Sequence, residues 1–61
     1  MSNLNEVELS NLRHMFIFGK ADEVRNQEFA SQASSPEVKQ FFEQAAQGAK
    51  KNSQTLMKFL Q

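Results

Sequence analysis

The sequence contains no cysteine, no tryptophan and no tyrosine, and its single histidine is His14. A chain without cysteine forms no disulfide bonds, and one histidine cannot supply the four nitrogen or sulfur ligands of a closed zinc site. The chain has 61 residues, and a domain of about 60 residues buries only about 60% of the surface that its unfolded form exposes. Domains this small usually depend on a disulfide, a metal or association with another chain. We therefore expect self-association.

Charge of one sign and long hydrophobic runs are also missing. Seven basic residues balance seven acidic residues, whereas nucleic-acid-binding domains normally carry a clear excess of lysine and arginine. The longest apolar run, Met15–Phe18, is far shorter than the roughly 20 residues of a membrane span. Met1–Asn11 lacks the basic start and apolar core of a secretory signal peptide. We expect no nucleic-acid partner, no membrane partner, and synthesis in the cytoplasm.

The single proline, Pro36, indicates where one helix starts and another has ended. Ser35 is suited to the N-cap, proline to the first helical position, and Glu37 to the positive end of the helix dipole. A residue that precedes proline is disfavoured in the α region, so an earlier helix should end near Ser34. The chain therefore divides into two helical halves around a very short turn.

The first half has its own start signal. Asn5 can cap a helix, and Glu8 lies three residues later, which is the spacing of a capping box. Alternation of period two, typical of strands, is absent. The sequence predicts an all-α fold in which helices over about 6–33 and 36–60 form an antiparallel two-helix hairpin, a single domain over 1–61.

Helical periodicity predicts a dimer of such hairpins. The first helix carries a main apolar stripe and a second apolar edge at Ile17, Ala21 and Val24, and one partner helix cannot cover both. Two hairpins packed as a homodimeric four-helix bundle would cover both. The residues expected in the core or the dimer interface are Leu9, Leu12, Phe16, Ile17, Gly19, Val24, Phe41, Phe42, Ala45, Ala49, Leu56 and Phe59.

Both glycines lie inside predicted helices, at Gly19 and Gly48. Each costs about 1 kcal/mol relative to alanine in a helix interior. Close approach of two helices, beside Ala45 and Ala49, explains their presence. We therefore expect both glycines at helix–helix contacts.

Catalytic and metal-binding patterns are not found in the sequence. Di-iron bundles use inward carboxylates with Glu-x-x-His pairs, and no such pair exists because the only histidine is His14. The serines have no positioned base, and the isolated glycines form no phosphate loop. We predict no catalytic residue, no cofactor and no metal site, and a surface or interface position for His14. The alternative is a weak oxygen-only metal site in which a symmetric dimer brings two copies of Glu23 together, with Asp22 at its margin.

The junction between the two predicted helices resembles a known family. The stretch 28–42, EFASQASSPEVKQFF, and the ending 54–60, QTLMKFL, are similar to coat F-type spore coat proteins. The resemblance implies a ferritin-like half-bundle that a second copy completes. Family members often carry a glutamate and histidines at the bundle centre, where this sequence has Gly19, Ala49 and Asn52. The resemblance therefore implies a member whose central site is degenerate.

These observations together predict a non-enzymatic structural protein that acts by self-association. The resemblance implies a location in the spore coat, with other coat proteins as further partners. Two alternatives are the metal-binding module already described and a small helical adaptor that contributes its hairpin to a larger protein.

Overall fold

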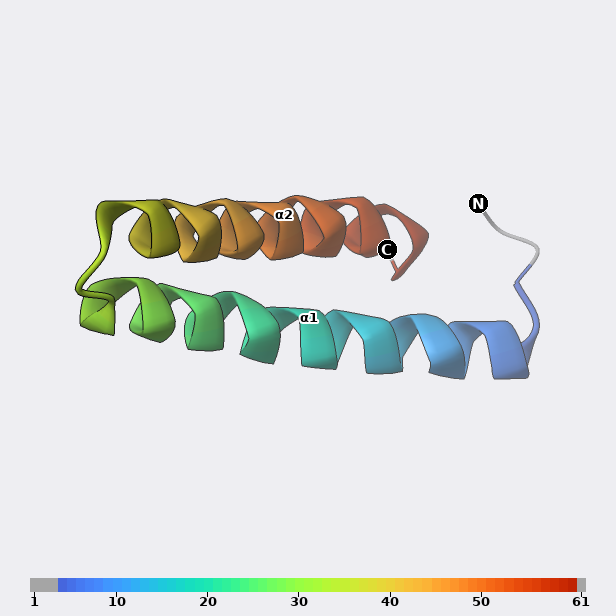
Figure 1. Ribbon diagram of the computed structural model, residues 1–61. Coiled ribbons are helices and arrows are strands. Elements are labelled where there is room, and N and C mark those ends of the chain that lie inside the picture. The colour runs from blue at the N-terminus through green and yellow to red at the C-terminus, as the bar shows by residue number, and fades with distance from the viewer. Residues whose placement is uncertain (1–3, 61) are drawn as a thin grey trace.

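The computed structural model describes residues 4–60, which form two antiparallel helices lying side by side (Figure 1). Helix α1 spans Glu6–Gln32 and helix α2 spans Pro36–Leu60. No strand occurs between residues 4 and 60. The predicted all-helical hairpin is therefore confirmed for this part of the chain, while residues 1–3 and 61 of the predicted domain lie outside the described residues.

Helix α1 begins with the predicted capping box. The backbone N–H of Glu8 donates to Oδ1 of Asn5 at 2.8 Å, and the backbone N–H of Asn5 donates to Oε1 of Glu8 at 3.1 Å. Two backbone donors at the helix start, which have no partner within the helix, are thereby satisfied. The cap fixes the first turn of α1 at Glu6.

A short connection over residues 33–35 joins the helices. Ala33 has an extended backbone (φ −69°, ψ 134°), which ends α1 at Gln32, one residue before the predicted boundary. Pro36 is the first residue of α2, and the N–H of Lys39 donates to the carbonyl oxygen of Ser35 at 2.9 Å. Proline at the first helical position loses no hydrogen bond, so the chain reverses direction here at little cost.

The contact between the helices, here called the seam, follows a seven-residue period. Residues with restricted exposure recur on α1 at steps of three and four, and the same spacing occurs on α2. This is the packing pattern of two helices that cross at a shallow angle. The seam consists of Leu9, Leu12, Phe16, Gly19, Glu23, Asn26 and Ala30 on α1, of Ala33 directly after α1, and of Phe42, Ala46, Ala49, Ser53, Leu56 and Leu60 on α2.

Small residues occupy the middle of the seam. A Cβ atom added at Gly19 would lie 3.1 Å from Oγ of Ser53, so the helices approach closely at this point. The predicted role of Gly19 is therefore confirmed. A Cβ atom at Gly48 would meet nothing within 4 Å. The prediction that Gly48 lies at a helix–helix contact is wrong within the chain, because this residue of α2 points away from α1.

The hairpin is a single elongated layer. Its Cα atoms extend over 46 × 14 × 12 Å, and the radius of gyration is 14.2 Å, whereas a compact chain of this length has about 10.5 Å. The accessible surface is 4912 Å², against about 4,000 Å² for a folded monomer of 7.0 kDa. Two packed helices therefore leave more surface uncovered than a globular monomer of the same mass.

Candidate interaction surface

The seam separates two long faces of the hairpin, and one of them carries most of the exposed aromatic side chains. Helical spacing places five large apolar residues on this side, here called the aromatic face. The aromatic face comprises Met15, Phe18 and Phe29 of α1 and Phe41 and Phe59 of α2. Phe18 is 62% exposed and Phe41 is 65% exposed.

Aromatic contacts show that the two helices contribute to the same face. Near the turn, the rings of Phe29 and Phe42 lie 5.1 Å apart, and those of Phe41 and Phe42 lie 5.4 Å apart in an edge-on arrangement. Such geometries add about 0.5–1.5 kcal/mol per pair beyond the burial of the rings. At the open end, Phe59 lines a shallow hollow with Leu4 and Asn11. The aromatic face thus runs along most of the hairpin.

The middle of the aromatic face has smaller and polar side chains. Asp22 of α1 forms an ion pair with Arg25, with Nη1 of arginine 3.1 Å from Oδ1 of aspartate, and both side chains are 58% exposed. On α2 the corresponding positions are Ala45 and Asn52. The face is therefore bulky at both ends and shallow in the middle.

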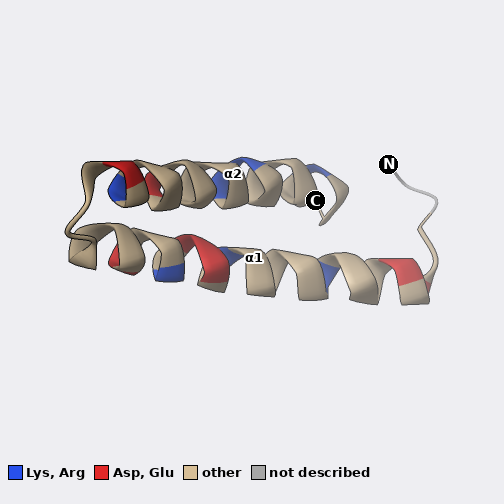
Figure 2. Ribbon diagram, in the orientation of Figure 1, with Lys and Arg blue, Asp and Glu red and all other residues tan. Residues whose placement is uncertain are grey.

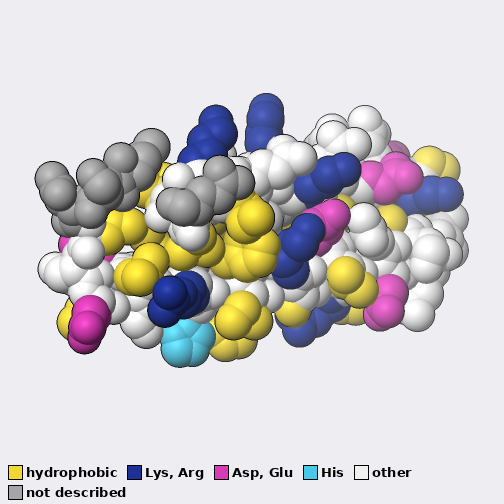
Figure 3. All heavy atoms as spheres, turned by 180° about the vertical axis from the view of Figure 1, so that it is seen from behind, with side chains coloured by type: hydrophobic (Ala, Val, Ile, Leu, Met, Phe, Trp, Pro, Cys, Tyr) yellow, Lys and Arg dark blue, Asp and Glu magenta, His cyan; other side chains and the backbone are white. Residues whose placement is uncertain are grey.

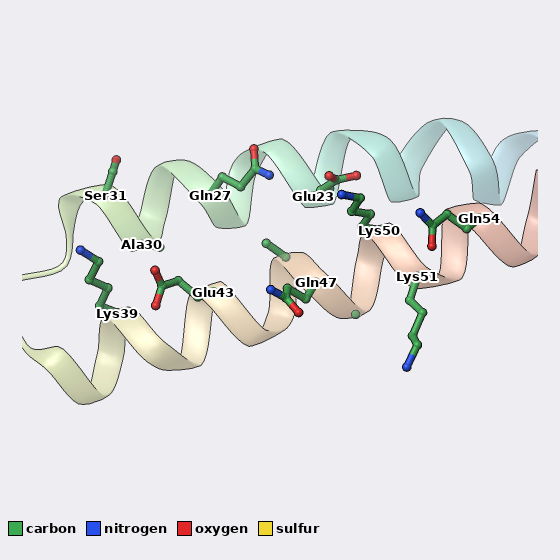
Figure 4. A pocket seen from close by; sticks show the side chains of 12 residues that line it. Glu23, Gln27, Ala30, Ser31, Lys39, Glu43, Gln47, Lys50, Lys51 and Gln54 are labelled. Atoms are coloured by element: carbon green, nitrogen blue, oxygen red, sulfur yellow. The ribbon is translucent and has the colours of Figure 1, made fainter.

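The opposite face, here called the lysine face, is mainly polar. A groove between the helices is lined from α1 by Gln27 and from α2 by Lys39, Glu43 and Lys50 (Figure 4). Basic and acidic residues are mixed along α1 and the first half of α2, whereas the second half of α2 carries only basic ones (Figure 2). The groove is open and offers no enclosed cavity for a small substrate.

Two aliphatic residues that we expected at an interface, Ile17 and Val24, lie on the same side as the lysine face. They precede Ser31 of its groove by 14 and seven residues, which places the three on one stripe of α1. Ile17 is 62% exposed and Val24 is 54% exposed. Seen from behind, the molecule shows such hydrophobic side chains scattered among charged ones (Figure 3).

His14 lies on the surface, as its position in the sequence indicates. It is exposed and its ring stacks on Phe18, with the ring centroids 5.5 Å apart and the planes nearly parallel. Within residues 4–60, no group of three or more His, Asp and Glu side chains is placed to hold a metal ion. In this arrangement His14 extends the aromatic face.

The two carboxylates considered for a weak metal site point in different directions. Asp22 pairs with Arg25 on the aromatic face, whereas Glu23 enters the seam with its side chain 14% exposed. The ammonium group of Lys20 lies 3.5 Å from Oε1 of Glu23, and this buried oxygen accepts no hydrogen bond. Each carboxylate has its own cation, so the structure does not bring the two together within one chain.

The seam contains one buried polar residue that the sequence did not reveal. Ser53 is 2% exposed, and its hydroxyl group has no hydrogen-bond partner. A seven-residue spacing from Ala46 and Leu60 places it on the seam, but serine resembles a surface residue in a helical pattern. The aromatic-face residues Met15, Phe18 and Phe29 were also missed as a set, although two seven-residue steps relate Met15 to Phe29.

The residues predicted for the core or the dimer interface fall into two groups. Nine of them have restricted exposure and lie at or beside the seam, namely Leu9, Leu12, Phe16, Gly19, Phe42, Ala45, Ala49, Leu56 and Phe59. Three are exposed, namely Ile17, Val24 and Phe41. Phe41 lies across the hairpin from Ile17 and Val24, so one docked partner cannot cover all three.

Comparisons with known protein families, with curated proteins and with solved structures found no match for this chain. Between residues 4 and 60, neither helix is long and apolar enough to cross a membrane.

Proposed function

We propose that this chain is a non-enzymatic structural protein that acts by self-association, and that two hairpins pack as a homodimeric, ferritin-like four-helix bundle. The observation that supports the proposal is the aromatic face. Its rings of Phe18 and Phe41 are more than 60% exposed, and transferring such a ring from water to a packed interior contributes about 1.5–3 kcal/mol. A second copy provides that interior.

The surface area favours one partner of similar size. The hairpin exposes about 900 Å² more than a globular monomer of its mass. A standard stable interface buries about 800 Å² on each partner. Association with one further hairpin is therefore enough to reduce the exposed area of each chain to that of a globular monomer of the same mass. A larger assembly is not needed for that.

Sedimentation equilibrium over a concentration series tests the proposal. We expect a species of twice 7.0 kDa at micromolar concentration, which dissociates toward the mass of a single chain on dilution. A folded monomer at every concentration would contradict self-association. If that monomer instead captures a larger protein from a lysate, the adaptor alternative replaces this proposal.

The resemblance of residues 28–42 and 54–60 to coat F-type proteins supports a place for the dimer in the spore coat, with other coat proteins as neighbours. A fluorescent fusion expressed in sporulating cells tests this part. We expect a ring of fluorescence around the developing spore. Fluorescence spread evenly through the mother cell would contradict it and would leave the dimer unaffected.

The metal-binding alternative has little structural support within one chain, because Asp22 and Glu23 lie on different faces and each pairs with a cation. Thermal melts with iron, manganese and zinc test it. We expect no shift of the melting temperature, since no group within residues 4–60 gathers three suitable ligands.

A further inference from the structure

The two faces of the hairpin offer different surfaces for a second copy, and we propose that the aromatic face is the dimer interface, with α1 of each copy packed antiparallel on α2 of its partner. This inference rests on the proposed function and deepens it by naming the face and the register. The lysine face then remains in contact with solvent.

Charge and side-chain size favour the aromatic face over the lysine face. The groove of the lysine face is lined by charged side chains, among them Lys39, Glu43 and Lys50. Interface centres are depleted of lysine and glutamate and rich in aromatic residues. Phe18, Phe41 and Phe29, which are 62%, 65% and 40% exposed, match that composition.

The register follows from the contact between Gly19 and Ser53. Because the helices are antiparallel, each step toward the end of α1 corresponds to a step toward the start of α2. Two residues that lie at the same position along the hairpin axis, here called equal height, therefore have numbers that add to about 72. A two-fold axis parallel to the helices leaves every height unchanged, so α1 of one copy lies on α2 of the other in this same register.

This register sets the aromatic ends of the two copies against each other, because the two-fold axis leaves every height unchanged. Met15 lies over the partner's Phe59, and Phe29 lies between the partner's Phe41 and Ala45. Burial of these apolar side chains against one another favours association.

The polar middle of the aromatic face is matched in the same register. Asp22 lies level with the partner's Asn52, whose amide can donate to the carboxylate.

A rival arrangement has its two-fold axis perpendicular to the helices, so that α1 lies on α1 and α2 lies on α2. Near the mid-length of the hairpin this places Asp22 close to Asp22 of the partner subunit. Two carboxylates facing each other are unfavourable.

Two neighbouring residues of equal exposure test which face is used. Phe18 and Ile17 are both 62% exposed, but they lie about 100° apart around α1, Phe18 toward the aromatic face and Ile17 toward the lysine face. We expect Phe18→Ser to raise the dimer dissociation constant at least about 100-fold, because each dimer carries two copies of the change. The matched control Ile17→Ser should change it less than about threefold. A larger effect of Ile17→Ser would overturn the assignment of the face.

Disulfide trapping tests the register, and the chain suits it because it contains no cysteine. We would prepare Asp22→Cys and Asn52→Cys as separate chains, one of them tagged, and oxidise each alone and as a mixture. The proposed register predicts a covalent heterodimer in the mixture and little product from Asp22→Cys alone. Self-linking of Asp22→Cys would overturn it in favour of α1 on α1. Glu43→Cys on the lysine face is the control and should not link.

Different results would contradict self-association on the one hand and the proposed face and register on the other. A chain that stays monomeric in sedimentation equilibrium contradicts the proposed function itself. A chain that is dimeric but resists Phe18→Ser, or that links through Asp22→Cys alone, contradicts only the face and register proposed here. A dimer in which neither Asp22→Cys nor the mixture links also overturns the register.

Discussion

The seam and the aromatic face differ in a way that is unusual for a small domain. The middle of the seam, which is the interior, holds Gly19, Ala46 and Ser53, whereas the outer face holds the large rings of Phe18 and Phe41. Small residues let two helices approach closely, and closely packed helices leave no room between them for large side chains. The bulk of the apolar surface is therefore moved outward, where only another molecule can bury it.

Because the seam and the aromatic face differ in this way, the fold and the assembly depend on largely separate sets of residues. Ala30, Ala46 and Leu56 are the buried hydrophobic residues of the described chain, and they hold the hairpin together. Phe18 and Phe41 of the aromatic face remain more than 60% exposed in the isolated hairpin. Changes in the seam should therefore alter the stability of the fold, while changes on the aromatic face should alter the association.

The largest effect is expected at Leu56, which is 5% exposed and has the largest buried side chain in the seam. Leu56→Ala should lower the free energy of unfolding by about 2–5 kcal/mol. A chain of this length has only about 3–9 kcal/mol in total, so much of the helical circular dichroism should be lost at 25 °C. The neighbouring Met57, 41% exposed, is the control. An equal loss in Met57→Ala would show that the seam does not dominate stability.

Removing the unpaired hydroxyl group of the seam should stabilise the hairpin. Ser53 is 2% exposed and its Oγ has no hydrogen-bond partner, and burying a hydroxyl group without one costs about 1–3 kcal/mol. Ser53→Ala should raise the free energy of unfolding by about 1 kcal/mol in urea titration. Ser31→Ala, at an exposed hydroxyl, should change it little. A destabilised Ser53→Ala would mean that this hydroxyl group is in fact bonded.

The two glycines allow the same substitution to be compared inside and outside the seam, since Gly19 lies in the seam and Gly48 lies outside it. Alanine gains about 1 kcal/mol over glycine in a helix interior. Gly48→Ala should show most of this gain in the free energy of unfolding. Gly19→Ala should show less, because its Cβ atom would lie 3.1 Å from Oγ of Ser53. In a Ser53→Ala background the gain at Gly19 should recover, and additive effects in this double-mutant cycle would contradict the contact.

The smallest effect is expected from the ion pair on the aromatic face. Asp22 and Arg25 are each 58% exposed, and exposed pairs contribute about 0.2–1 kcal/mol or less. Asp22→Asn should change the free energy of unfolding of the monomer by less than about 0.5 kcal/mol in thermal melts at low concentration. A greater loss would show that this pair supports the hairpin itself.

The helix boundaries were predictable because local signals determine them. Asn5 with Glu8 marks the start of α1, and Pro36 marks the start of α2, and both act within four residues of the backbone that they control. The seam positions of Leu12, Phe16 and Leu56 followed from helical spacing. Local chemistry and periodicity therefore sufficed for the hairpin.

The faces were harder to predict, because α1 carries apolar residues around most of its circumference. Periodicity alone did not decide between the side of Ile17 and the side of Phe18, and only the way in which α2 lies against α1 separates them. The position of Gly48 depends on the same information. Ser53 was missed because a serine in a helix gives no signal of burial unless the opposing residue, Gly19, is known.

The extended backbone of Ala33 and the proline at the start of α2 also limit how two chains can exchange parts. A hairpin with a short connection can open into one long continuous helix, and two such helices can pair by domain swapping. Pro36 disfavours the helical conformation at Ser35 and would remove a hydrogen bond from a continuous helix. The turn therefore opposes a swapped product, and the exchangeable unit of any assembly is the whole hairpin.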